Sequence, residues 1–301
     1  MSNELKGSLW GLLGVAAFAF TLPATRFAVP FLDPLFVGLG RAVLAACFAG
    51  LLLLLLRQPR PTRAQLIKLV VVALGVVVGF PLLSTWAMVS LSAVHGGVVL
   101  GILPLMTAAV AVCLSDERPT IGFWLASVAG SLLVIAFSLL QGVGSFSSGD
   151  LVLFGAMLLA AMGYAVGGLL AKELGGWQVI CWALVIALPF TLLPALLHFP
   201  LSWEQIPGSA WLAFLYLAII SQLFAFFFWN KGLALGGVAR VSQTQLLQPF
   251  ITIIAAVFLL GERVDIITIA FAVTVASVVI VGNRMKMEST INGRQGGRRG
   301  N

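Results

Sequence analysis

Charged residues are scarce in this sequence of 301 residues: they make up 9% of it, whereas soluble domains carry about 25%. Apolar residues make up 60% and the mean hydropathy is +1.10, which excludes a soluble globule and makes the lipid bilayer the surrounding solvent. The net charge of +7 comes from Lys and Arg scattered through short loops and the C-terminal tail. Scattered charge of this kind argues against a nucleic-acid-binding protein and suits a membrane protein beside anionic lipid.

Residue types that build catalytic and metal centres are also few. The two histidines and three cysteines form no cluster with metal-ligand spacing, and no Gly-rich phosphate loop followed by Lys is present. Cys47, Cys113 and Cys181 lie in apolar runs, so we interpret them as packing residues. We expect no metal, no cofactor and no ATP drive, and the N-terminal segment lacks the pattern of a cleavable signal peptide.

Ten apolar stretches are long enough, at about 20 residues each, to cross a bilayer as helices. They cover residues 7–29, 34–56, 65–90, 94–114, 120–140, 149–171, 177–198, 207–230, 237–260 and 265–283. The loops between them are too short for a further domain, and the tail 284–301 is polar and Gly-rich, as disordered segments are. The predicted fold class is therefore an all-α integral membrane protein.

The distribution of positive charge predicts the orientation of the spans. With both termini in the cytoplasm, 14 of the 17 Lys and Arg residues fall in cytoplasmic segments, as the positive-inside rule requires. Five spans per half is an odd number, so the second half enters the membrane upside down relative to the first. We therefore expect two inverted five-helix repeats, 7–140 and 149–283, followed by a basic cytoplasmic tail.

Residues 91–119 and 236–264 share one pattern at an offset of 145 positions. At that offset three pairs of residues align: Pro104 with Pro249, Glu117 with Glu262, and Arg118 with Arg263. A Pro in the same span of each half of a duplicated bundle is typical of secondary transporters, whose binding site lies between the halves. We predict hinge or gating roles for five residues of the broken spans: Pro23, Gly97, Pro104, Gly237 and Pro249.

With a Pro followed by Glu thirteen positions later in each half, the chain resembles EamA-type members of the drug/metabolite transporter superfamily over residues 7–283. Gly261-Glu262-Arg263 fits the small-Glu-basic turn of that family, whereas the first copy has Asp116 in place of Gly. The resemblance implies ten helices around a central cavity lined by spans 1, 3, 4, 6, 8 and 9. It is greatest to bacterial exporters of amino acids, aromatic ones included. It implies a small-molecule substrate, a lipid bilayer and a monomer or homodimer in the plasma membrane.

Polar and aromatic residues within the spans are the candidates for a binding site, because lipid cannot satisfy polar groups. On the ninth span Arg240, Thr244 and Gln248 share one helix face, and we interpret this face as cavity lining rather than interhelical hydrogen bonding. Aromatic walls with sparse polar groups suit an apolar side chain carrying a polar head. The predicted substrate-binding residues are Phe20, Thr21, Ser84, Trp86, His95, Tyr164, Gln222, Trp229, Thr244, Gln245 and Gln248.

Ionisable residues near the spans leave alternatives open. Arg41, the one charge well inside a span, either partners a substrate carboxylate or is structural, bonded to backbone carbonyls or reaching the headgroups. We favour the structural interpretation, because Arg41 lies about two turns from its helix start. A histidine can change charge near neutral pH, which makes His95 a candidate for proton relay, but a helix-end role without proton relay is favoured. Glu117 and Glu262 precede the fifth and tenth spans, where we expect them to cap helix starts.

Together these features predict a secondary transporter or facilitator that exports small amphipathic metabolites, chiefly amino acids, by alternating access. No Asp or Glu lies in mid-span, so a carboxylate proton relay and a site for drug-like cations are both disfavoured. A transporter of phosphorylated compounds or nucleotide sugars would need several cationic residues in the cavity. An intramembrane enzyme would need convergent His, Asp and Glu residues within the spans, and a receptor that does not transport is a further alternative.

Overall fold

The computed structural model describes residues 1–91, 93–115, 117–140 and 147–252, together with 266–267, 270–271, 273–275 and 277–278. Within these residues the regular elements are α-helices, some of them interrupted by short 3-10 and π turns. A helix satisfies its own backbone hydrogen bonds, which is the condition for placing so apolar a chain in lipid. The predicted all-α class is therefore confirmed for the described part of the chain.

The first half contains eight α-helices and three short π or 3-10 segments. In order they are α1 (Asn3–Ala19), α2 (Thr21–Ala28), η1 (Phe36–Gly40), α3 (Arg41–Leu55), α4 (Arg63–Val72), η2 (Ala73–Gly79), α5 (Phe80–Ser90), α6 (Ala93–Val99), η3 (Leu100–Ile102), α7 (Leu103–Leu114) and α8 (Ile121–Leu140). Several of these follow one another without a loop, so that α1 with α2, or α4 with η2 and α5, forms one long interrupted helix.

The second half repeats this construction. Its elements are α9 (Ser148–Leu174), α10 (Gly176–Leu197), η4 (Trp203–Gln205), α11 (Gly208–Leu215), η5 (Tyr216–Phe224), α12 (Ala225–Gly236), α13 (Val238–Ser242) and η6 (Gln243–Leu247). Helical residues continue from 248 to 252, and the remainder of the predicted ninth span, together with most of the tenth, lies outside the described residues.

Six helical segments of the described chain are long and apolar enough to cross a membrane. They are Asn3–Ala28, Phe36–Leu55, Arg63–Ser90, Ser148–Leu174, Gly176–Leu197 and Gly208–Gly236. Two shorter apolar helices, Leu100–Leu114 and Ile121–Leu133, fall within the predicted fourth and fifth spans. The six long segments coincide with the predicted spans 1, 2, 3, 6, 7 and 8 to within a few residues at each end, except that the eighth runs six residues further.

Local sequence signals set the boundaries of these helices. The Thr62 hydroxyl accepts the N–H of Gln65, and the Gln65 amide oxygen accepts the N–H of Thr62, which makes a capping box at the start of α4. Asp150 receives the N–H of Ser147 at 2.7 Å at the start of α9. Gly237 turns the chain from α12 into α13 with φ = 86°, a conformation that residues with a Cβ rarely adopt.

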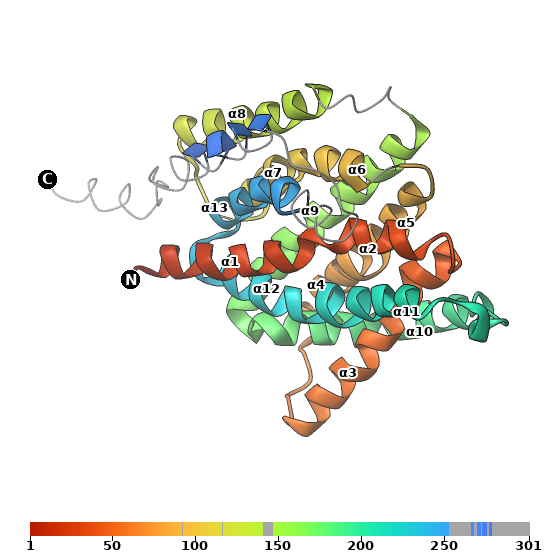
Figure 1. Ribbon diagram of the computed structural model, residues 1–301. Helices are drawn as coiled ribbons and strands as arrows, with labels where there is room; N and C mark the ends of the chain where they lie inside the picture. Colours follow the sequence, from red (N-terminus) through yellow and green to blue (C-terminus); the bar gives the residue numbers. More distant parts are fainter. Residues whose placement is uncertain are drawn as a thin grey trace, which may run out of the picture.

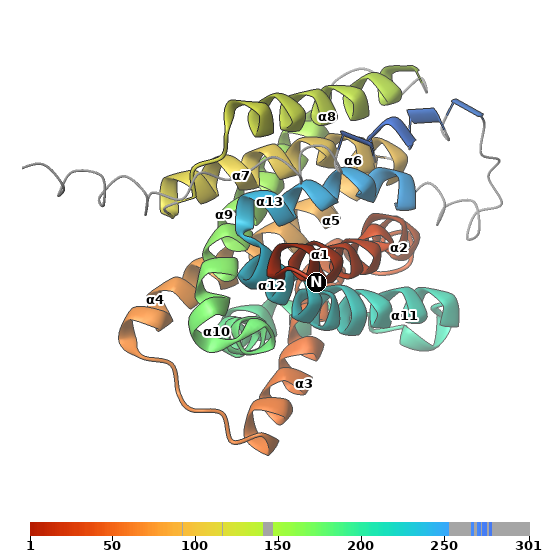
Figure 2. The same cartoon turned by 90° about the vertical axis from the view of Figure 1, so that its left-hand side faces the viewer.

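Glycines bring two pairs of long helices into backbone contact. α1 lies along α12 in both ribbon views (Figures 1 and 2), and a Cβ at Gly7 would be 2.4 Å from the nitrogen of Gly236. Further along the same pair, a Cβ at Gly232 would be 2.6 Å from the nitrogen of Gly11. α9 packs in the same manner on η2 and α5, where a Cβ at Gly75 would be 2.9 Å from Cα of Gly163. Small residues of this kind allow close packing of membrane helices.

The helix contacts between the two halves are symmetric: when each span of the first half is swapped with the equivalent span of the second half, every packed pair matches another pair or itself. The first span packs on the eighth through α1 and α12, and the sixth packs on the third through α9, η2 and α5. The second packs on the seventh through α3 and α10, and the fourth packs on the ninth through α7 and α13. In Figure 2, α8 lies at one edge of the assembly and α3, the helix that packs on α10, lies at the opposite edge.

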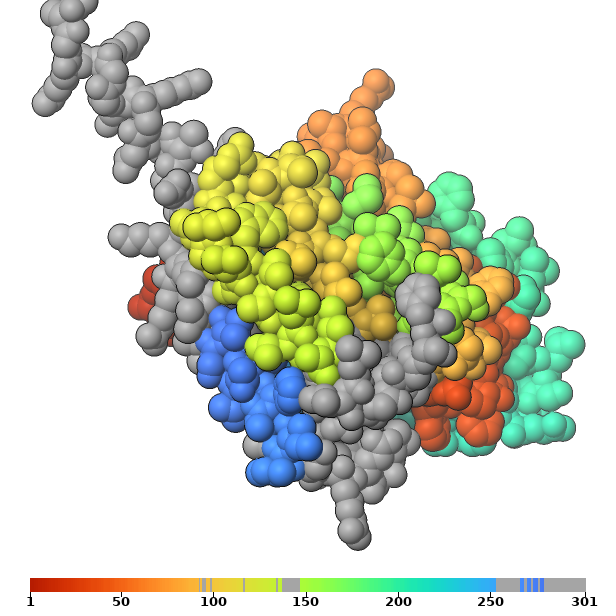
Figure 3. All heavy atoms as spheres, turned by 90° about the horizontal axis from the view of Figure 1, so that it is seen from above, coloured from red at the N-terminus to blue at the C-terminus, as the bar shows by residue number. Residues whose placement is uncertain are grey.

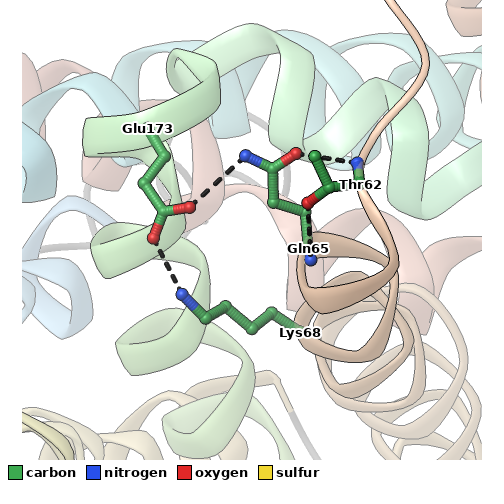
Figure 4. A network of polar contacts seen from close by, with 4 residues as sticks. All are labelled: Thr62, Gln65, Lys68 and Glu173. Carbon is green, nitrogen blue, oxygen red and sulfur yellow. Dashed lines mark hydrogen bonds and ion pairs between the residues drawn. The ribbon is translucent and has the colours of Figure 1, made fainter.

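Peripheral contacts close the assembly at its edges. On the face seen in Figure 3, the described C-terminal residues lie beside α8, and Val275 packs with Leu246 and Phe250. At the start of α4, Lys68 and Gln65 reach the Glu173 carboxylate of α9 at 2.8 and 3.3 Å (Figure 4). The Lys68 and Glu173 side chains are both 45% exposed, so this ion pair contributes at most about 1 kcal/mol.

Candidate functional site

A small cavity lies where the two halves meet. The space open to the centres of water molecules is about 20 Å³, enough for about one water, so the conformation is closed around it. Its polar lining consists of Thr21, Arg41, Tyr164, Ser221, Gln222 and Gln248. Its apolar lining consists of Phe18, Leu22, Val76, Phe80, Leu100, Leu103 and Phe226. These residues come from the six spans that the family resemblance implies and, in addition, from the second span through Arg41.

The lining helices depart from regular α geometry at the level of the cavity. The π segment η1 ends immediately before Arg41, η2 contains Val76, and η5 contains Ser221 and Gln222. The 3-10 segment η6 ends immediately before Gln248. π turns are rare and are frequent at functional sites, and a 3-10 stretch within a helix often marks a hinge, because both re-aim side chains and free backbone carbonyls from the regular hydrogen-bond ladder.

Side chains of the second half bond carbonyls of the first half near the cavity. Gln222 Nε2 donates to the carbonyl of Val76 at 3.0 Å, within the π segment η2. Thr252 Oγ1 donates to the carbonyl of Ala19 at 2.7 Å, and Ala19 is four residues before Pro23, which has no N–H to offer it. The two halves are therefore joined through backbone groups that helix interruptions leave free.

Arg41 is buried at the cavity and has no hydrogen-bonded partner among the described residues. The residue is 1% exposed, and its Nε and Nη1 atoms have no hydrogen-bond partner among the described residues. The groups within electrostatic range of its guanidinium are the phenols of Tyr164 and Tyr216. Nε and Nη1 donate to no carbonyl of the described residues, and their burial keeps them from the headgroups, so neither form of the structural interpretation is seen at these two atoms. The π segment η1 ends immediately before Arg41.

Neutral groups make up the rest of the cavity surface. The hydroxyls of Thr21 and Ser221 are 2.8 Å apart and hydrogen-bond one another across the halves. Tyr164 packs against Phe18 and Phe226, with ring centroids 6.3 and 6.0 Å away. One cation among neutral polar and aromatic groups gives the cavity a net positive character.

No acidic side chain lines the cavity in the described part of the chain. The described acids instead make contacts at helix ends and loops, or are exposed. Glu4 pairs with Arg240, Asp33 with His198 and Glu173 with Lys68; Asp150 caps α9, Glu117 caps α13, and Glu204 is exposed. The pairing with Glu4 ties Arg240 to α1 rather than to the cavity.

The predicted binding residues divide into those at the cavity and those away from it. Thr21, Tyr164, Gln222 and Gln248 line it. Four others are buried outside the lining: Ser84, Trp229, Thr244 and Gln245. Ser84 and Thr244 donate to the carbonyls of Pro81 and Val241 within their own helices, and Trp229 packs behind Tyr164 at 5.3 Å. Gln245 has no side-chain hydrogen bond among the described residues.

Two of the predicted binding residues lie on other surfaces, and the side chain of a third is not described. Trp86 is 59% exposed and does not line this cavity, because Thr85 is buried and the next residue is turned by about 100° away from it; its binding role stays a prediction. Phe20 lines a separate groove of about 410 Å³ between α2 and α11, together with Pro23. The side chain of His95 lies outside the described residues, although its backbone belongs to α6.

Four of the five predicted hinge residues lie at or close to interruptions of their helices. Pro23 follows the break between α1 and α2, and Pro104 follows η3 at the start of α7. Pro249 follows η6 by two residues, and Gly237 separates α12 from α13. Gly97 lies in α6, where an added Cβ would be 3.7 Å from Thr252. Their hinge role stays a prediction.

Several lining residues were not predicted from the sequence. They include Arg41, for which the sequence favours a structural role, and Ser221, Phe18 and Phe226. Phe18 and Phe226 pack edge to face at 4.9 Å on the two halves. A usable signal existed for Ser221, since it precedes Gln222 within a span, but helical spacing does not place two successive residues on one face. The π geometry of η5 is what brings both to the cavity.

The sequence is similar to known membrane proteins. The profile of the EamA-like transporter family matches residues 5–140 and 147–283, once in each half. A Bacillus subtilis (strain 168) protein named "Uncharacterized transporter YdeK" is 44% identical over 284 residues, 94% of this chain and 99% of its own. One from Streptantibioticus cattleyicolor, named "Probable terminal-alkyne amino-acid exporter", is 24% identical over 306 residues, 97% of this chain and all of its own (100%). A solved crystal structure matches with a TM-score of 0.73 at 16% identity, over 92% of this chain and 98% of that one, which indicates a shared fold.

Proposed function

This chain belongs to the EamA-like transporter family, and from that membership we propose that it carries small amphipathic metabolites, amino acids foremost, out across the bacterial plasma membrane. It is a multi-pass membrane protein and a transporter rather than an enzyme. The amino-acid assignment is supported by the relative named as an amino-acid exporter and by the character of the cavity.

The observation that carries the substrate proposal is the composition of the cavity between the halves. It offers one buried guanidinium, several neutral hydrogen-bonding groups and walls of Phe and Tyr. Such a surface suits a small solute with a polar, partly anionic head and an apolar side chain. Amino acids, aromatic ones included, have this form.

We further propose ten spans in two inverted repeats with both termini in the cytoplasm, opening to alternate faces of the membrane. Support comes from the 145-residue offset of the Pro–Glu pattern and from the positive-inside bias. It also comes from the helix contacts between the halves, which match one another when equivalent spans of the two halves are swapped. The interruptions at Pro23, Pro104 and Pro249 would serve as hinges between the two open states.

The chemistry of the cavity disfavours the other substrate classes. Phosphorylated compounds and nucleotide sugars carry two or more negative charges, whereas the described lining contains one cation. Drug-like cations are held by buried carboxylates, and the described lining contains none. A monoanionic or zwitterionic solute fits better than either.

The proposal is tested by counterflow in proteoliposomes preloaded with unlabelled amino acids, with uptake of the labelled compound as the measurement. We expect uptake above that of empty liposomes for at least one amino acid. Ser221→Phe, which fills the cavity, should abolish it, whereas Leu197→Phe, at a side chain that is 74% exposed, should not. Absence of uptake for every amino acid would remove the substrate proposal, and unchanged uptake by Ser221→Phe would remove the cavity as the pathway.

A further inference from the structure

We infer that Arg41 is the anchor for a carboxylate group of the substrate, and that the carboxylate rather than an ammonium group is the charge that the site recognises. The inference rests on the proposed function, in that it names the substrate class of the same cavity. It starts from the guanidinium atoms Nε and Nη1, which are buried at the cavity without partners in the described chain.

An unpaired guanidinium is costly to bury, because its hydration is lost and nothing replaces it. A protein that retains such a group is less stable than it would be with an apolar side chain of similar size. Arg41 lines the cavity between the halves, so a ligand that enters this cavity can supply the missing partner. A carboxylate is the matching partner, since a planar guanidinium binds its two oxygens through two parallel hydrogen bonds.

The protein itself does not supply the counter-ion. Each described acid lies at a helix end or loop, and the groups near the guanidinium are the phenols of Tyr164 and Tyr216. Four acids lie outside the described residues, and the sequence puts them at span ends or in the tail: Asp116, Glu262, Asp265 and Glu288. The compensating negative charge is therefore that of the transported solute.

The same lining offers no charged partner for an ammonium group. An amine would meet the neutral oxygens of Gln248, Tyr164 or Ser221 and the aromatic faces of Phe18 and Phe226. Neutral acceptors and ring faces hold an ammonium less strongly than a carboxylate does. Carboxylic acids that lack the amine should therefore bind, whereas amines that lack the carboxylate should not.

The ligand arm of the test measures thermal stabilisation of the purified protein by three matched pools: L-amino acids, the corresponding deaminated carboxylic acids, and the corresponding amines. We expect the first two pools to raise Tm and the amines to leave it unchanged. Arg41→Met should weaken binding of any stabilising acid by about tenfold or more, the loss expected for one charged hydrogen bond. The affinity of Arg41→Lys for the acid should lie between those of the unsubstituted protein and Arg41→Met. The control Arg60→Met, in an exposed loop, should bind the acid as tightly as the unsubstituted protein does. Stabilisation by amines, or by acids equally in Arg41→Met, would overturn the inference.

The second arm needs no ligand and separates the inference from the proposed function. In buffer free of carboxylates and chloride, ligand-free Arg41→Met should have a Tm equal to or above that of the unsubstituted protein, because an uncompensated charge has been removed. A Tm well below it would identify Arg41 as a bonded structural residue and overturn the inference. If no pool stabilises the protein, the amino-acid proposal fails, yet this arm still decides the role of Arg41.

A chloride titration distinguishes the source of the anion. If chloride raises the Tm of the unsubstituted protein as much as the acids do, and Arg41→Met removes that effect, the guanidinium holds an inorganic ion instead. That result would overturn the assignment to a substrate carboxylate. We expect chloride to change the Tm of the unsubstituted protein no more than it changes the Tm of Arg41→Met.

Discussion

The carboxylate of Glu117 accepts the backbone N–H of Val238 at 2.8 Å, and its second oxygen accepts that of Ala239 at the same distance. A residue of the turn between α7 and α8 thus caps the first turn of α13, in the other half of the chain. Capping chemistry was predicted for Glu117, but on the helix that follows it in sequence. The positive φ of Gly237 orients the two N–H groups toward the carboxylate, which no local sequence rule anticipates.

Glu117→Gln should destabilise the protein by about 1–2 kcal/mol, because one charged acceptor for two helix N–H groups is lost. The measurement is Tm in detergent by tryptophan fluorescence. Glu204→Gln, at an exposed residue, is the control and should leave Tm unchanged. An unaltered Tm for Glu117→Gln would mean that the cap contributes nothing to stability.

The contact between α1 and α12 depends on the absence of side chains. Gly232→Ala places a Cβ 2.6 Å from the nitrogen of Gly11, so the two backbones must separate and the expected cost is about 1–3 kcal/mol. Gly208→Ala adds the same methyl group where nothing lies within 4 Å, and should be neutral or slightly stabilising. Equal Tm values for the two variants would contradict the close packing.

Most of the fold follows from hydropathy and charge alone, because lipid leaves few alternatives to helices of about 20 residues. The Pro–Glu spacing at an offset of 145 then predicted the family, which the profile match confirms. What the sequence could not supply is the rotation of each helix. Trp86, predicted as a binding residue, is 59% exposed, because a helix turns each residue by about 100° from the one before it and Thr85 is buried.

The same limitation applies to the candidate site. Thr21, Tyr164, Gln222 and Gln248 were selected because polar groups avoid lipid, and that physical rule holds at the cavity. Arg41 was judged by its distance from the helix start, which predicts reach to the headgroups but not the direction of the side chain. That direction depends on η1, a π segment with no clear sequence signature.

The capping box at α4 is expected to contribute more to the stability of the protein than the ion pair between Lys68 and Glu173 beside it. Thr62→Ala should cost about 1 kcal/mol, since one helix N–H loses its acceptor. Lys68→Met should cost less than about 0.5 kcal/mol, because both charges of the pair are half exposed. Tm values of the two variants measured side by side test this order, and a larger loss for Lys68→Met would reverse it.

The hydroxyl pair Thr21–Ser221 joins the halves at the cavity wall. A double-mutant cycle with Thr21→Val and Ser221→Ala should give a coupling energy of about 0.6 kcal/mol, typical of hydrogen bonds between membrane helices. The free energies come from reversible unfolding of the four variants in mixed micelles. Strict additivity would show that the 2.8 Å contact carries no energy in this environment.

The most direct test of the central claim is accessibility of the cavity from both faces of the membrane. Ser221→Cys, in a background in which Cys47, Cys113 and Cys181 are alanine, would be exposed to a membrane-impermeant thiol reagent in right-side-out and in inside-out vesicles. Alternating access predicts labelling from each face, slowed from each face by a transported amino acid. Labelling from one face alone, or from neither, would contradict the account.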